Sequence, residues 1–121
     1  MMNTALKELE FKPKVLIAED DRNILLSIKI ALESTLELEI ITAENGQEAI
    51  EKAETMLPDM LILDIKMPKK DGFEVCEYLK NKKETKHIPI MFLTAEFTDI
   101  KSKAKGLDLG ADDYLLKPFD P

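Results

Sequence analysis

Cysteine and long apolar runs are scarce in this sequence of 121 residues. The one cysteine, Cys76, excludes an internal disulfide and a zinc cluster built on several thiolates. No apolar stretch approaches the roughly 18 residues that a membrane-spanning helix needs. Residues 1–14 contain no apolar core of signal-peptide length. We therefore expect a soluble protein with no membrane partner, located in the cytoplasm.

Positive charge is also in deficit. Lysine and arginine number 17 against 24 acidic residues, which gives a formal net charge of −7. This balance argues against nucleic acid as a direct partner, because binding to phosphates favours a positively charged protein. Hydrophobic residues at 45% and charged residues at 34% are typical of an ordinary globular protein. The length suits one domain with one core.

Short apolar runs alternate along the chain with segments of helical periodicity. Continuous apolar runs predict buried strands over 14–18, 60–64, 90–94 and 114–116, and an alternating segment predicts an edge strand over 37–41. Between them, helical spacing predicts helices over 24–32, 49–57, 73–79 and 100–107. Asp21 or Asn23 is the expected cap of the first helix. This order predicts an α/β fold, with a parallel sheet and helices on both faces.

Polar residues follow four of these strands: the Glu19-Asp20 pair, Asp64, Thr94 and Lys117. Parallel strands end at the same edge of a sheet, so these groups are expected to converge. Three carboxylates within about 5 Å repel by roughly 3 kcal/mol per pair at an effective dielectric constant near 20, so some are protonated or a cation lies among them. Oxygen ligands alone favour Mg²⁺. A carboxylate beside a hydroxyl and a lysine can also accept a phosphoryl group.

Each residue has a simpler interpretation when it is taken alone. Glu19 and Asp20 could be a solvated helix N-terminus, where acidic residues are favoured. Thr94 could be a strand-end hydroxyl bonded to the backbone, and Tyr114 a half-buried strand aromatic. Their convergence at one edge is what favours the functional interpretation.

The motifs in combination resemble the receiver domain of bacterial response regulators, the phospho-accepting half of two-component signalling. They are an acidic pair after the first strand, Asp-x-x-Met-Pro after the third, Thr-Ala after the fourth and Lys-Pro-Phe after the fifth. The resemblance runs from Lys14 to Pro118, so residues 1–13 are interpreted as an N-terminal arm and 14–121 as the domain. It implies a flavodoxin-like, doubly wound, five-stranded parallel sheet in the order 2-1-3-4-5.

The resemblance implies a role for each acidic residue. Asp64 would be the phosphorylated aspartate. Asp20 would be the main Mg²⁺ ligand, assisted by Glu19, by Asp64 itself and by the backbone carbonyl of Lys66. A histidine kinase or a phosphotransfer protein would supply the phosphoryl group.

The remaining implied residues respond to the phosphoryl group. Thr94 and Lys117 would contact it, and Tyr114 would turn inward when Thr94 moves. Lys66 and Glu96 occupy positions that modulate phosphoryl loss in the family. We expect a Lys66–Glu96 pair to hinder the attacking water, which would make the phosphoryl group comparatively long-lived.

The chain departs from the family pattern at its end. Receiver domains carry a fifth helix after Lys-Pro-Phe, and this sequence stops at Asp120-Pro121, where that helix would begin. We therefore expect a domain truncated before helix five, which exposes apolar sheet and favours self-association. Any output would lie in a downstream protein or in an output domain beyond Pro121.

Two other functions compete with a signalling switch that catalyses only its own phosphorylation and dephosphorylation. The first is an aspartate-nucleophile phosphatase, a true enzyme. That class has a second acid two residues after the nucleophile, where this chain has Lys66. The second is a degenerate receiver that acts only as a protein-binding module, which the intact acid, threonine and lysine set disfavours.

Overall fold

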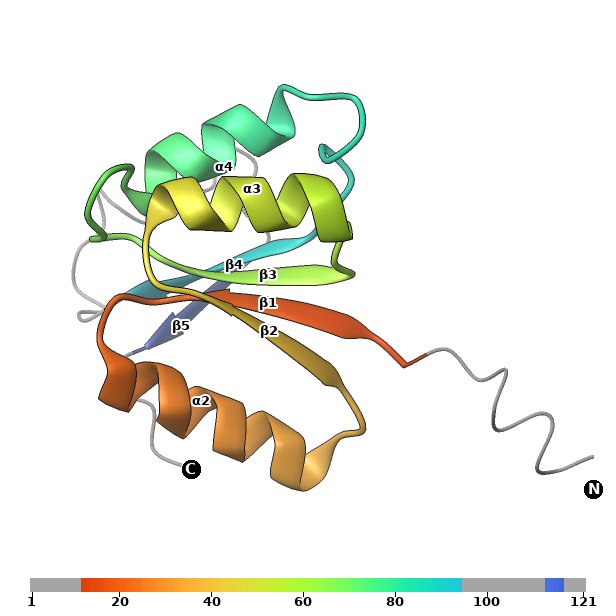
Figure 1. The fold of residues 1–121 in the computed structure, drawn as a ribbon, viewed down its shortest axis with the longest axis vertical. Helices are drawn as coiled ribbons and strands as arrows, with labels where there is room; N and C mark the ends of the chain where they lie inside the picture. The colour runs from red at the N-terminus through yellow and green to blue at the C-terminus, as the bar shows by residue number, and fades with distance from the viewer. Residues whose placement is uncertain (1–11, 95–112, 117–121) are drawn as a thin grey trace, which may run out of the picture.

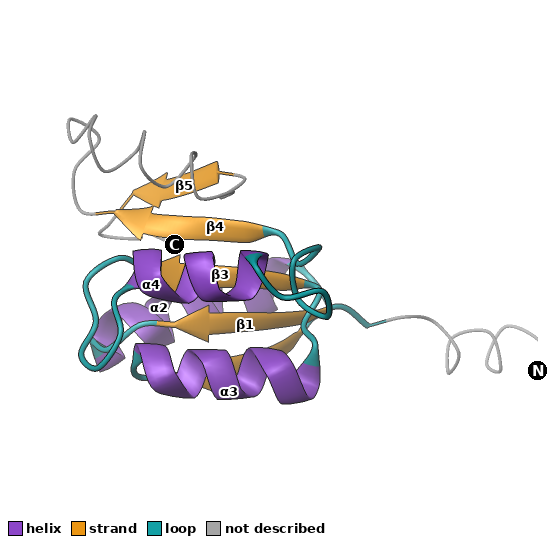
Figure 2. Cartoon of the chain, turned by 90° about the horizontal axis from the view of Figure 1, so that it is seen from above, coloured by secondary structure: helices purple, strands orange, loops and turns teal. Residues whose placement is uncertain are grey.

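Five parallel strands form one sheet at the centre of the molecule. The computed structural model describes residues 12–94 and 113–116. The strands lie in the order β2-β1-β3-β4-β5, which confirms the doubly wound topology expected from the sequence. Their bounds are β1 Lys14–Ala18, β2 Glu39–Ala43, β3 Met60–Asp64, β4 Ile90–Thr94 and β5 Asp113–Leu116. All neighbouring strands pair in parallel, so their carboxyl ends share one edge, and the arrows of β1, β4 and β5 point the same way in Figure 2.

Helices cover both faces of the sheet. Within the described residues, α2 (Arg22–Thr35) lies on one face, and α3 (Gly46–Met56) and α4 (Gly72–Lys80) lie on the other (Figure 1). Successive strand residues point to opposite faces, so β1, β2, β3 and β4 each contribute side chains to two apolar layers. The layer under α3 and α4 contains Leu16, Ala18, Leu61, Leu63, Ile90 and Phe92. The layer under α2 contains Val15, Ile17, Ile62 and Leu93.

Side-chain caps fix where the three helices begin. Asp21, rather than Asn23, caps α2, and its Oδ1 accepts from the backbone N–H groups of Asn23 at 2.9 Å and Ile24 at 3.3 Å. Asn45 caps α3 and Asp71 caps α4 in the same way. Because each cap directly follows a strand or its loop, each helix starts close to the edge where the strands end.

The predicted bounds of the edge strand were wrong by two residues. The sequence predicted a strand over 37–41, whereas β2 runs over Glu39–Ala43. Pairing with β1 sets these bounds, with Lys14 opposite Glu39 and Ala18 opposite Ala43. The Glu39 N–H also donates to the Pro13 carbonyl at 2.8 Å. The alternating pattern extended too early because Leu38 packs against the α2 layer before the ladder begins.

A polar clamp joins α3 to the end of α4. The Lys82 ammonium lies 2.6 Å from Glu54 Oε2 and 3.1 Å from the Tyr78 hydroxyl. The hydrogen bond from Lys82 holds the pKa of Glu54 below its ordinary value, and the same bond raises the pKa of Lys82. The clamp keeps the two helices side by side over their shared apolar layer.

Several expectations lie outside the described residues. They are most of the N-terminal arm, the helix over 100–107, the truncation before helix five and the self-association inferred from it. Among the residues that the structure describes, no helix has the length and apolarity needed to cross a membrane.

Replacing Leu57 with glycine should stabilise the protein. It follows α3 with φ 46° and ψ 64°, a left-handed conformation that costs a non-glycine residue about 1 kcal/mol, and its side chain is 51% exposed. We expect Leu57→Gly to raise the free energy of unfolding in urea by about 0.5–1 kcal/mol. The matched control Met56→Gly, inside the helix, should lower it by about 1 kcal/mol. Equal losses in both variants would contradict this interpretation.

Candidate functional site

Three carboxylates meet at the carboxyl edge of the sheet. β1 and β3 are neighbours, with Ala18 opposite Leu63, so Glu19 after β1 lies beside Asp64 at the end of β3. Carboxylate oxygens of Glu19, Asp20 and Asp64 all lie within 4.8 Å of one another. The convergence expected from the sequence is therefore present for these three residues.

The group is buried on one side and open on the other. Glu19 is 0% exposed and Asp64 is 3% exposed, whereas Asp20 is exposed. Glu19 Oε2 accepts a hydrogen bond from the Asp21 N–H at 3.1 Å, and the Glu19 N–H donates to the Ala43 carbonyl at 3.0 Å. A ligand from solvent would therefore reach the group on the side of Asp20.

The donor set suits a hard divalent cation. Three carboxylates at this separation repel one another, and a positive ion between them relieves that repulsion. All three offer oxygen, and the group contains no imidazole or thiolate. Oxygen ligands with one side open to water fit Mg²⁺, which keeps several waters and binds through one or a few carboxylates.

The loop between β3 and α4, residues 65–71, is held tightly beside Asp64. The Gly72 N–H donates to the Ile65 carbonyl at 2.7 Å. A Cβ on Gly72 would overlap the Asp64 carbonyl oxygen and lie 2.8 Å from Ile65 Cα, so only glycine allows this approach. Met67 is buried in the core under α3 and α4. Lys66 lies on this loop, two residues after Asp64, and is exposed.

The other predicted site residues are placed only in part. Thr94 is the last residue of β4, and the register that puts Asp64 opposite Leu93 brings the Thr94 backbone next to the end of β3. Tyr114 lies in β5 with its backbone opposite Phe92. The side chains of Thr94 and Tyr114, and the whole of Lys117 and Glu96, fall outside what the structure describes.

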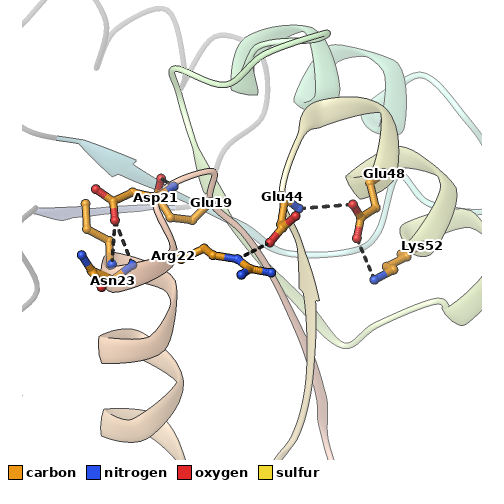
Figure 3. A network of polar contacts seen from close by, with 8 residues as sticks. Glu19, Asp21, Arg22, Asn23, Glu44, Glu48 and Lys52 are labelled. Atoms are coloured by element: carbon orange, nitrogen blue, oxygen red, sulfur yellow. Dashed lines mark hydrogen bonds and ion pairs between the residues drawn. The ribbon is translucent and has the colours of Figure 1, made fainter.

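A polar network lies behind the carboxylates and was not predicted from the sequence (Figure 3). Arg22 Nε pairs with Glu44 Oε1 at 3.0 Å, and the Glu44 N–H reaches Glu48 Oε2 at 3.5 Å. Glu48 also pairs with Lys52 at 2.8 Å, and the hydrogen bond from Lys52 lowers the pKa of Glu48. Local sequence pattern carries no signal for tertiary partners of this kind.

A doubly wound parallel sheet with an acidic group at its carboxyl edge defines the class of protein. The family described as the response regulator receiver domain matches residues 15–121. The chain belongs to this family, which confirms the resemblance noted from its motifs. Membership of this family assigns the chain a role in two-component signalling.

Two similar proteins are named as regulators of transcription. The chain is 44% identical over 108 residues to the alkaline phosphatase synthesis transcriptional regulatory protein PhoP of Bacillus subtilis, covering 89% of this chain and 43% of PhoP. It is 41% identical over 114 residues to the probable transcriptional regulator ycf27 of Guillardia theta, covering 94% of this chain and 43% of that protein. The chain thus spans less than half the length of these relatives.

Solved structures agree with the fold. The chemotaxis response regulator CheY4 of Vibrio cholerae superposes with a TM-score of 0.84 at 34% identity, covering 92% of this chain and 91% of CheY4. A putative response regulator of Chloroflexus aurantiacus gives a TM-score of 0.85 at 36% identity, covering 92% and 89%.

Removing one carboxylate should stabilise the protein when no metal is present. Asp20→Asn removes one negative charge from the group, so in EDTA we expect the free energy of unfolding to rise by about 1–3 kcal/mol. Urea unfolding at neutral pH measures it. Asp21→Asn is the matched control, because it makes the same change of charge one residue away and keeps the α2 cap. A loss of stability in Asp20→Asn would contradict carboxylate repulsion.

Proposed function

We propose that this chain is a phospho-accepting switch in which Asp64 takes a phosphoryl group from a histidine kinase or a phosphotransfer protein. An Asp64 carboxylate oxygen attacks phosphorus, the bond from phosphorus to the donor imidazole nitrogen breaks, and an acyl phosphate forms on Asp64. The observation that carries the proposal is the group of three carboxylates at the sheet edge of a receiver-family domain.

The neighbouring residues have complementary tasks in this proposal. Glu19 and Asp20, with Asp64 and the Lys66 carbonyl, hold Mg²⁺, which neutralises charge on the transferring phosphoryl group when it is bound. Glu19 is fixed by its hydrogen bond from the Asp21 N–H, so it is preorganised as a ligand. The Lys117 ammonium pairs with the phosphoryl oxygens and neutralises part of their charge, and the Thr94 hydroxyl donates a hydrogen bond to one of them.

The proposed readout is a change of packing around β4 and β5. Phosphorylation adds a charge of about −1.5 to −2 beside Asp64. Thr94 ends the strand next to β3, so its movement toward the phosphoryl group frees space for the ring of Tyr114 on β5. This couples a local charge event to a two-state element at the edge of the sheet.

The wider assignments are parts of the same proposal. We take residues 1–13 as an arm and 14–121 as the receiver domain. The partners are a cytoplasmic phosphodonor and a downstream protein or a further domain, in keeping with the transcriptional regulators that the chain resembles over less than half of their length. The domain turns over no external substrate.

Phosphorylation can be tested with a small phosphodonor. We expect wild-type protein incubated with acetyl phosphate and Mg²⁺ to gain one acid-stable, base-labile phosphoryl group, detected by intact-mass spectrometry, because the proposal assigns the acceptor oxygen to Asp64, at the end of β3 beside Glu19 and Asp20. Asp64→Asn should abolish the adduct.

Asp59→Asn provides the control, since Asp59 accepts from the Lys14 N–H at the opposite end of the sheet. It should phosphorylate as wild type does. Release of many equivalents of phosphate would favour the phosphatase, and a wild-type protein without adduct would favour a binding module.

Lys66 and Glu96 should set the lifetime of the phosphoryl group. An exposed ion pair is worth up to about 1 kcal/mol, so Lys66→Ala or Glu96→Ala should shorten the half-life by up to about fivefold. Loss of the adduct after removal of donor measures the rate. Lys69→Ala, another exposed lysine on the same loop, is the control. Unchanged half-lives in both variants would exclude the pair.

A further inference from the structure

The turn between β2 and α3, residues 44 and 45 with Gly46 as the first residue of α3, contacts the loop between β3 and α4 on one side and the first residue of α2 on the other. Glu19 and Asp20 lie on the loop after β1, and Asp64 is the last residue of β3, directly before the 65–71 loop. The turn supplies no oxygen to the group of three. It nevertheless makes close contacts toward the 65–71 loop and toward the start of α2.

On one side, Gly46 packs directly against the loop between β3 and α4. Its N–H donates to the Pro68 carbonyl in a long hydrogen bond of 3.4 Å. A Cβ on Gly46 would overlap the Lys70 carbonyl oxygen and lie 2.6 Å from Lys70 C and 2.7 Å from Lys70 Cβ. The backbone of Gly46 is not left-handed, so close approach, and not φ, requires glycine here.

On the other side, the last residue of β2 and the turn contact Glu19 and the first residue of α2. The Glu19 N–H donates to the carbonyl of Ala43, the residue before the turn. Arg22 reaches from the start of α2 to Glu44, as Figure 3 shows. Arg22 and Glu44 are 85% and 49% exposed, so this ion pair is weak and the backbone contact at Glu19 dominates.

The turn is itself fixed to α3. The Asn45 side chain accepts from the Glu48 N–H at 2.8 Å. Lys52 holds Glu48 and donates to the Thr42 carbonyl at 2.6 Å, which ties the first turns of α3 back to β2. The turn can therefore act as a rigid spacer between the two loops.

We propose that the β2–α3 turn, through Gly46, is a positioning element for the acidic group. Contact with Lys70 and Pro68 sets how far the 65–71 loop stands from α3, and this fixes the Lys66 carbonyl relative to Asp64. The backbone bond to Ala43 fixes Glu19 from the other side. The inference rests on the proposed function for the identity of the ion, Mg²⁺.

Direct Mg²⁺ binding to the unphosphorylated chain tests this role. Gly46→Ala pushes the 65–71 loop outward, so we expect the Kd for MgCl₂ in calorimetry to rise about tenfold, as it does when residues that orient metal ligands are changed. The rise in melting temperature on adding Mg²⁺ should shrink accordingly. Half-saturating Mg²⁺ for phosphorylation should rise by the same factor, while the rate at saturating Mg²⁺ approaches that of wild type.

Gln47→Ala is the matched control, because Gln47 is the exposed next residue of the same helix. It should bind Mg²⁺ as wild type does. A folded Gly46→Ala with wild-type affinity, or a wild-type chain that binds no Mg²⁺, would overturn the inference.

A second pair of variants decides the matter if Gly46→Ala does not fold. Asn45→Ala removes the cap that anchors the turn, whereas Asn45→Ser keeps a neutral oxygen acceptor. We expect weaker Mg²⁺ binding in the first and recovery in the second, and equal affinities would overturn the inference. Failure of the proposed function is distinguishable, because wild type would then form no Asp64 adduct while its Mg²⁺ titration remained intact.

Discussion

Mutual repulsion among Glu19, Asp20 and Asp64 is the constraint on which the site depends. The parallel pairing of β1 with β3 forces the first and last of these residues together, and burial removes the water that would screen them. Folding of the two apolar layers supplies the free energy that holds the charges at this distance. Any cation that binds there relieves the repulsion, so the acidic group favours the ion and the phosphoryl transfer that we propose.

The two apolar layers and the edge loops have separate tasks. Side chains alternating along β1, β2, β3 and β4 anchor the sheet to α2 on one face and to α3 and α4 on the other, so the ends of these strands are fixed in space. The loops that leave those ends then need only short-range restraints. Gly72 provides one beside Asp64, and Gly46 provides another beside Lys70. Both restraints are backbone contacts, which tolerate little displacement.

The sequence was most informative where burial is complete. Continuous apolar runs predicted β1, β3 and β4 with the bounds observed, and the parallel topology then implied that the acidic residues converge. The predicted bounds of β2 were two residues too early, because partial exposure leaves its sequence pattern ambiguous. Pairing with β1 decides the observed bounds. The contact of Gly46 with Lys70 could not be predicted, since it joins loops 24 positions apart without any local signature. The roles of Thr94, Tyr114, Lys117, Lys66 and Glu96 stay predictions.

Cys76, the one cysteine of the chain, lies in α4 and is wholly buried in the apolar layer under α3 and α4. Its thiol meets solvent only when that layer separates from the sheet, and α2 can fray without uncovering it. The rate at which a thiol reagent alkylates the native protein therefore measures how often the α3–α4 face of the sheet opens, and not the α2 face. A spectroscopic label attached through a cysteine introduced at the surface would meet almost no background from the folded chain.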